Sequence, residues 1–302
     1  MELVVNNNTT MQSIIIKDAI KKFIVDRTTR GLSKRTISGY EAEIYNFLKH
    51  TNIDDSNELI FLSKDAIDSF IIKRMNEVKP GTINVTLRAM RAFLYWCMSQ
   101  NYLPHFDIQL FKYQLEEQPV YSKDELFKLL IKPINNFSDW RSYAAIATMV
   151  SLGTRASTLC SIAITDIDFN DHQIVYRHLK NKRIACVPLS PQLSNILKEY
   201  ITLYCQNQKW LFCDTFGNQL TVSALRQSIK KYCKRRNVEY KGIHSFRRSF
   251  AKEYIMNGGN AFSLQKMLTH STLAMSAKYV NLYGNDLKMG FENLSPLDTI
   301  KR

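Results

Sequence analysis

The spacing of apolar residues predicts four amphipathic helices in the first hundred residues. Apolar side chains recur every three or four positions there, as they do on the buried face of a helix. Serine opens two of these segments, at Ser33 and Ser63, where its side chain can cap a helix. The four segments are 14–27, 33–50, 63–75 and 82–100. We therefore expect an all-helical domain over residues 13–110.

The segment that begins at Thr82 carries two stripes at helical spacing. The inward stripe comprises Leu87, Met90, Leu94 and Cys97. The second stripe comprises Asn84, Arg88, Arg91 and Tyr95. This second stripe fits either a solvated basic face or a face laid against DNA phosphates, with Asn84 near base edges.

The second half of the chain predicts a mixed domain over residues 121–302. Residues 111–120 have no clear period and are expected to form a linker. A capping box, Ser122 with Glu125, then opens a helix. Helical pattern continues to Gly153, gives way to short β-prone runs, and returns after residue 190. The expected fold class is mainly α with a small antiparallel β-sheet.

Charge adds the first indication of a partner. The chain has 41 Lys and Arg against 27 Asp and Glu, a formal net charge of +14. Much of the surplus lies in segment 226–248, where the single acidic residue is Glu239. Such a field suits a polyanion such as DNA, although solubility alone is the competing interpretation.

Other compositional features narrow the class of protein. No run of about 18 apolar residues occurs, so no membrane span is expected. The six cysteines lack metal-ligand spacing and are interpreted as reduced thiols, which indicates a cytoplasmic protein. Asp166, Asp168 and Asp171 fit turns better than a metal site, and there is no phosphate-binding loop motif. We therefore expect neither metal nor cofactor.

Chemistry on a phosphodiester without metal needs fixed cations, a nucleophile and an acid for the leaving oxygen. Arg155 lies where one predicted helix ends and the next begins, and His244 and Arg247 lie one helical turn apart. Tyr279 follows His270 by nine residues, half a turn out of phase on one straight helix at ~100° per residue. A break after His270, with Ser271 as the next cap, would let the two side chains converge.

Four motifs in this order resemble the tyrosine recombinase (phage integrase) family. They are GTRASTLCSI, HLKNKRIACVPLS, HSFRRSFAKEYIMNGG and LTHSTLAMSAKYV. The resemblance covers the C-terminal half, and the four-helix pattern before it is similar to the family's core-binding domain. It implies a tyrosine-recombinase catalytic domain that follows a DNA-binding one.

The resemblance also implies the role of each motif residue. Tyr279 would attack the scissile phosphate and form a 3′-phosphotyrosyl link. Arg155 and Arg247 would clamp its non-bridging oxygens, and His270 would add another donor. His244 would assist proton transfer to and from the tyrosine.

The general acid implied by the resemblance is Lys180, with Lys182 as the alternative, because Leu179 and Asn181 stand where the family often has glycine. Two other departures are Thr269, where the family usually has glycine, and Phe246, where it usually has leucine. We interpret both as packing changes.

A compact recombinase without an arm-binding domain is implied, because about a dozen residues precede the first predicted helix. Its expected partners are duplex DNA with inverted-repeat core sites and three further copies of itself, exchanging strands through a Holliday junction. A directionality or accessory protein stays open, as does docking of the C-terminal tail on a neighbouring copy. Expected DNA contacts are Lys34, Arg35, Asn84, Arg88, Arg91, Lys182, Arg235 and Arg248. The alternatives are a type IB topoisomerase and a non-catalytic DNA-binding protein.

Overall fold

The chain folds into two compact units. The structure, a computed structural model, describes residues 12–114, 118–134, 136–177, 184–269 and 272. The units comprise Met1–Leu115 and Glu116–Arg302, so the division lies inside the segment predicted as a linker.

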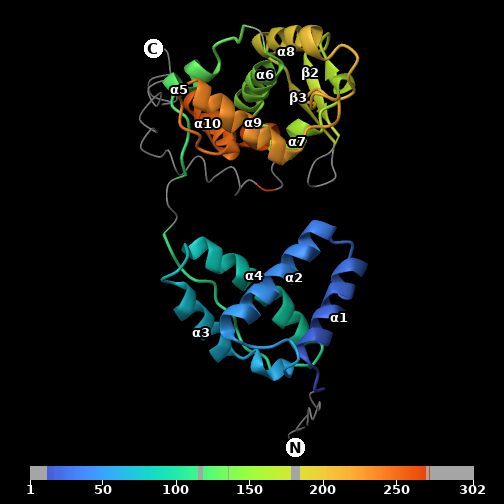
Figure 1. Cartoon of the computed structure of the whole chain (residues 1–302), viewed down its shortest axis with the longest axis vertical. Helices are drawn as coiled ribbons and strands as arrows, with labels where there is room; N and C mark the ends of the chain where they lie inside the picture. Colours follow the sequence, from blue (N-terminus) through green and yellow to red (C-terminus); the bar gives the residue numbers. More distant parts are fainter. Residues whose placement is uncertain (1–11, 115–117, 135, 178–183, 270–271, 273–302) are drawn as a thin grey trace, which may run out of the picture. The chain divides into compact units, whose positions relative to one another are not determined.

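The first unit contains the predicted helices (Figure 1). They are α1 (Ile16–Thr29), α2 (Lys34–Thr51), α3 (Lys64–Arg74) and α4 (Pro80–Ser99), with a 3-10 turn at Leu59–Phe61. The side chains of Ser33 and Ser63 accept hydrogen bonds from main-chain N–H groups of the first turn, which confirms both predicted caps. Helix α4 begins at Pro80, before the predicted Thr82, because proline is well suited to the first position of a helix.

Aromatic and aliphatic side chains form the core of the first unit. The predicted inward stripe of α4 is fully buried, which confirms that prediction. Phe23 of α1 makes edge-to-face contacts with Phe93 and Trp96 of α4. In α2, Ile44, Phe47 and Leu48 are buried, while Tyr40 is half-buried against the same core. Helical periodicity was therefore a good guide to the inward faces of these helices.

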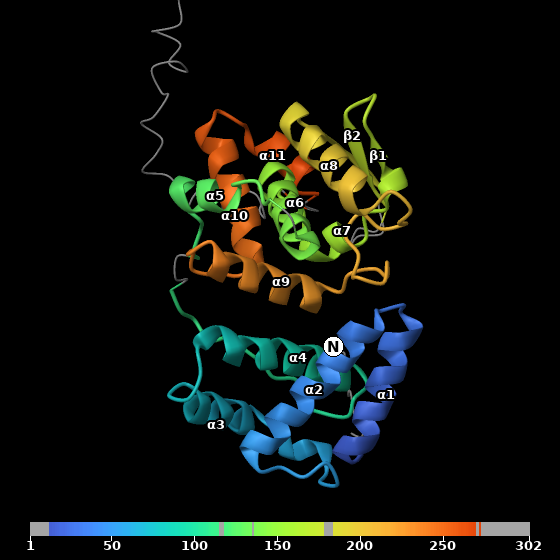
Figure 2. The same ribbon diagram turned by 45° about the horizontal axis from the view of Figure 1, so that its top comes forward.

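The second unit is built around a central helix, α6. Its helices are α5 (Lys123–Leu129), α6 (Phe137–Leu152), α7 (Ala156–Cys160), α8 (Pro191–Tyr204), α9 (Val222–Arg235), α10 (Ile243–Met256) and α11 (Ala261–Met267). Helix α6 packs against α8, α9 and α10 and lies among them in Figure 2. It is buried almost throughout, because small residues such as Ala144 and Ala145 let neighbours approach closely.

A three-stranded antiparallel sheet lies beside these helices. Its strands are β1 (Ile167–Asp168), β2 (Gln173–Tyr176) and β3 (Ala185–Pro188), in the order β1-β2-β3. Ile174 pairs with Val187 in the register, and both side chains are buried. The expected fold class is confirmed. Among helices of the described ranges, none is both long and apolar enough to cross a membrane.

Both ends of the predicted linker are attached to a folded unit. Phe111 packs on the first unit, where its backbone N–H and C=O each bond the Asn84 side chain at 2.8 Å. The Arg248 guanidinium donates to the Pro119 carbonyl at 3.2 Å in the second unit. The predicted capping box of Ser122 and Glu125 is present at the start of α5. The segment that connects the units is therefore shorter than 111–120.

Candidate active site

The turn between α6 and α7 places Arg155. Helix α6 ends at Leu152, and its C-cap Gly153 has a φ of 61°, which allows a sharp left-handed turn. Arg155 is the N-cap of α7. Its Nη1 donates to the Leu268 carbonyl at 3.2 Å and to the Thr269 Oγ1 at 3.0 Å. Arg155 thus connects the start of α7 to the end of α11. Its place between two helices agrees with the sequence analysis.

Arg247, on α10, contacts the same region at the end of α11. Its side chain is only 6% exposed. Its Nη1 donates to the Gly153 carbonyl at 2.6 Å, and its Nη2 donates to the Leu268 carbonyl at 2.8 Å. The guanidinium therefore ties the end of α6 to the end of α11, and a buried cation of this kind requires such acceptors.

The two arginines converge on one oxygen atom. The Leu268 carbonyl accepts from Arg155 Nη1 and from Arg247 Nη2, so both guanidinium groups lie within hydrogen-bond distance of it. Two guanidinium groups held this close repel one another unless negative charge lies between them. Their planar forks match the paired oxygens of a phosphate. The arrangement is therefore suited to clamping a phosphodiester.

His244 lies one turn before Arg247 on α10, and its side chain is exposed. Its pKa lies below the ordinary value, first because nearby protein removes part of its hydration, and second because arginine charges surround it. These arginines are Arg248, Arg247, Arg226 and Arg155. The imidazole is therefore neutral at neutral pH and can accept a proton.

The remaining predicted catalytic residues lie outside the described residues. They are Lys180, Lys182, His270 and Tyr279. Strands β2 and β3 form an antiparallel pair with Tyr176 opposite Ala185, and both lysines lie between these two residues in the sequence. Thr269, the last described residue before His270, contacts Arg155. Residues 184–190 and 268–269, which are described parts of the two motifs, belong to the second unit.

The aspartates that could suggest a metal serve as turn residues. Asp166 is buried and accepts from the Ala163 N–H at 3.0 Å and from Arg177 Nε at 2.6 Å. Asp168 accepts from the next turn's backbone N–H groups. No group of three His, Cys, Asp or Glu side chains within the described ranges could hold a metal ion. The turn interpretation of these aspartates is confirmed.

Comparison with known families gives this geometry its context. A sequence model of the phage integrase family matches residues 120–285, more than half of the chain. The chain belongs to the phage integrase family. The match begins at the start of the second unit and spans all six predicted catalytic residues.

Individual relatives extend the likeness over both units. The tyrosine recombinase XerD of Oceanobacillus iheyensis is 25% identical over 288 residues, which cover 89% of this chain and 95% of that protein. The Tn1549 transposon integrase in complex with transposon right end DNA has the same fold, with a TM-score of 0.74 and 17% identity over 88% of this chain and 94% of that one. A lambda integrase tetramer bound to a Holliday junction has a TM-score of 0.73 and 14% identity, over 89% of this chain and 78% of that one. Topoisomerase activity and non-catalytic DNA binding are not favoured by these matches.

Two residues depart from the family pattern, and the structure explains them differently. Phe246 is buried and stacks on Tyr121, with ring centroids 4.3 Å apart and planes at 13°. Its interpretation as a packing change is confirmed. For Thr269 the same interpretation is wrong, because its backbone is left-handed, with φ of 50°, and its hydroxyl bonds Arg155. Glycine is the residue best able to adopt a left-handed backbone, so a position where glycine is expected indicates a special backbone conformation. The departure at Thr269 therefore concerns backbone conformation and not packing.

Gly153 offers a test of how closely the arginine site is packed. A Cβ at this position would lie 2.4 Å from Phe250 Cδ1 and 2.6 Å from Leu268 Cδ2, and φ is positive. We expect Gly153→Ala to destabilise the protein by about 2–4 kcal/mol, from crowding and left-handed strain, and to slow DNA cleavage by displacing Leu268. Denaturant titration is the measurement. Gly258→Ala is the control, because its φ is 85° with no atom within 4 Å of the added Cβ. Equal loss in both variants would contradict the crowding.

The prediction that Asn84 faces DNA bases is wrong. Its side chain is 3% exposed, and both ends of its amide bond the Phe111 backbone. Asn84 instead ties the segment after α4 back onto that helix. Its neighbours on the predicted stripe differ in exposure, since Arg88 is exposed while Arg91 is half-buried over the Tyr95 ring. Periodicity gave the face of the helix but not the segment that covers it.

The other predicted DNA-contact residues are accessible to different degrees. Lys34 and Arg35 are exposed in the first turn of α2. Arg235 is exposed at the end of α9 and pairs with Asp139. Arg248 is half-buried and bonds Pro119 and Ser245. Lys34 and Arg35 are thus better placed than Arg235 and Arg248 to meet phosphates, and all four stay predictions.

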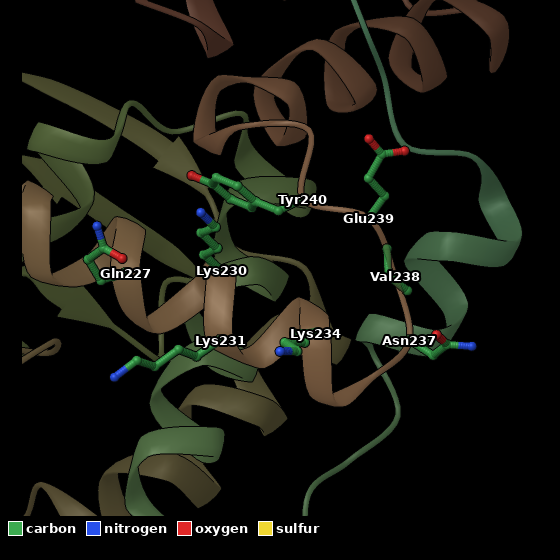
Figure 3. A pocket seen from close by; sticks show the side chains of 8 residues that line it. All are labelled: Gln227, Lys230, Lys231, Lys234, Asn237, Val238, Glu239 and Tyr240. Atoms are coloured by element: carbon green, nitrogen blue, oxygen red, sulfur yellow. The ribbon is translucent and has the colours of Figure 1, made fainter.

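The basic segment forms an open hollow along α9. Figure 3 shows three lysines rising from this helix and the tyrosine that follows it. The hollow has a volume of about 510 Å³ and is lined by Gln227, Lys230, Lys231, Lys234, Asn237, Val238, Glu239 and Tyr240. The three lysines are exposed, as long cationic side chains on a solvated face usually are. The charge surplus noted in the sequence is therefore available at the surface of the second unit.

Proposed function

We propose that this protein is a site-specific DNA recombinase that cuts and rejoins DNA through a covalent 3′-phosphotyrosyl intermediate. The observation that carries the proposal is the convergence of Arg155 and Arg247 on the Leu268 carbonyl, 3.2 Å and 2.8 Å away. Two guanidinium groups, one from the N-cap of α7 and one from α10, form a preorganised clamp for a pentacoordinate phosphate. Family membership supports the same chemistry.

The reaction breaks one bond and forms one. The Tyr279 oxygen attacks the phosphorus, its proton passes to a base, for which the neutral His244 is suited, and the P–O5′ bond breaks. Lys180, or Lys182 in its place, donates a proton to the leaving 5′ oxygen, and His270 donates to a phosphate oxygen. Religation is the reverse attack by a 5′-hydroxyl. The bond energy is conserved in the phosphotyrosine, so no nucleotide is consumed.

Recombination needs several active sites on two DNA sites. The lambda integrase relative in the comparison is a tetramer on a Holliday junction, and the fold is shared. We therefore propose a homotetramer that assembles on inverted-repeat core sites in the cytoplasm and exchanges strands in pairs. Two-fold pairs of protomers read two-fold DNA sites. A directionality or accessory protein would bias the assembly toward one direction.

Trapping the covalent intermediate tests the proposal. The probes are nicked suicide duplexes that carry the DNA sequences found on either side of the coding sequence. We expect an SDS-resistant adduct on a subset of these duplexes, and a released strand whose 5′ end is labelled by polynucleotide kinase without phosphatase treatment. Excess EDTA should leave the adduct yield unchanged.

The outcomes separate the competing functions. Adducts on unrelated duplexes, with relaxation of any supercoiled plasmid, would indicate a topoisomerase. Binding without an adduct on any duplex would indicate a non-catalytic DNA-binding protein. A released 5′-phosphate, or an adduct that requires added metal, would contradict the proposed chemistry.

A further inference from the structure

Thr269 holds a backbone conformation that threonine adopts only at a cost. Its φ of 50° lies in the left-handed region, where a β-branched side chain crowds the backbone and glycine does not. The residue follows the end of α11, and its N–H donates to the Lys266 carbonyl at 3.0 Å. Glycine is the usual residue just past a helix end. Strained residues of this kind persist where neighbours hold them, often at functional sites.

The Thr269 side chain supplies a contact that glycine lacks. Its Oγ1 accepts a hydrogen bond from Arg155 Nη1 at 3.0 Å, beside the bond from the same nitrogen to the Leu268 carbonyl. That carbonyl also accepts from Arg247 Nη2 at 2.8 Å. The turn at 268–269 therefore offers Arg155 two adjacent acceptors, one of which it shares with Arg247.

We propose that Thr269 is a positioning residue for Arg155, and that its hydroxyl fixes the plane of the guanidinium that clamps the scissile phosphate. Bidentate contact with phosphate depends on that plane, because the guanidinium donors have a fixed fork geometry. A hydrogen bond from a charged donor is strong enough to hold such an orientation. The inference rests on the proposed function and adds to it a residue outside the six predicted catalytic ones.

Three substitutions separate the hydroxyl from the backbone strain. Thr269→Gly removes the hydroxyl and relieves the strain, Thr269→Ser keeps the hydroxyl, and Thr269→Val keeps the branched shape without it. We expect Thr269→Gly to raise the Tm by about 2–4 °C while single-turnover cleavage of the suicide duplex slows about tenfold. Thr269→Val should slow cleavage at least as much, without the rise in Tm. Thr269→Ser should keep most of the wild-type rate.

His172→Gly is the matched control. His172 is exposed, lies in the turn between β1 and β2, and has a φ of 49°. The His172 carbonyl accepts a hydrogen bond from the Leu189 N–H at 2.7 Å, and this main-chain bond does not depend on the side chain that is replaced. We expect a similar rise in Tm with an unchanged cleavage rate, because relief of strain there is remote from the arginines.

Opposite movement of stability and rate in Thr269→Gly, with rescue by serine, supports the positioning role. A Thr269→Gly variant that cleaves as fast as wild type, or a serine variant as slow as the glycine one, overturns it while leaving the proposed function intact. A wild-type protein that traps no adduct overturns both.

Discussion

Phenylalanine at position 279 is expected to abolish the covalent DNA complex. The phenolic oxygen is the proposed nucleophile, and loss of an enzyme's nucleophile lowers the rate by more than about 10⁴-fold. Affinity for DNA should change little, because many phosphate contacts contribute to binding. The measurement is SDS-resistant adduct formation on the suicide duplex, with electrophoretic mobility shift as the binding assay.

Tyr283→Phe is the matched control for this prediction. It removes the same oxygen from the next tyrosine in the sequence, four positions further along. We expect it to trap the adduct at the wild-type level. If Tyr283→Phe loses the adduct and Tyr279→Phe retains it, the nucleophile has been assigned to the wrong tyrosine. Adduct formation at the wild-type level in both variants would exclude both residues as the nucleophile.

Lysine in place of Arg247 is expected to slow cleavage about 10²- to 10³-fold, the loss typical of removing one transition-state donor. Arg247 uses two different nitrogens to bond the Gly153 and Leu268 carbonyls, at 2.6 Å and 2.8 Å. A single ammonium cannot reproduce that fork. Because Arg247 is buried, a carbonyl left without its donor should also lower the free energy of unfolding by about 1–3 kcal/mol. Single-turnover cleavage and denaturant titration measure the two effects.

Arg141→Lys controls for the general effect of an arginine-to-lysine change. Arg141 also donates to a main-chain carbonyl, that of Cys213, at 2.7 Å, and it lies on α6. We expect a cleavage rate close to wild type in this variant. Arg247→Lys with a normal cleavage rate would remove Arg247 from the phosphate clamp, whatever its effect on stability.

Local patterns explain why much of the fold could be predicted. Serine caps at Ser33 and Ser63, the capping box at Ser122 and the stop at Gly153 act within one or two helical turns, so neighbouring residues suffice to specify them. Helix α4 begins two residues before the predicted Thr82, at Pro80, because proline suits the first position of a helix. The small sheet followed from β-prone runs separated by turn residues.

The candidate site was also predicted only in part. Order and spacing of the motifs were enough to propose Arg155, His244 and Arg247, and the structure places the first and last of these on one carbonyl oxygen. The role of Thr269 was missed, although its substitution for glycine was a usable signal of a left-handed backbone. Asn84 is buried, contrary to the prediction, because a polar residue on a helix face is exposed only where no other segment covers it.

By itself, the sequence determined the helices, the small sheet and the types of residue available for phosphate chemistry, because capping, periodicity and turn preference depend on neighbours along the chain. Only the tertiary structure decided which distant groups meet. The burial of Asn84 under Phe111 and the convergence of two arginines on Leu268 depend on long-range packing, which no local pattern encodes. A hydrogen bond between residues far apart in sequence exists only once the intervening helices have packed.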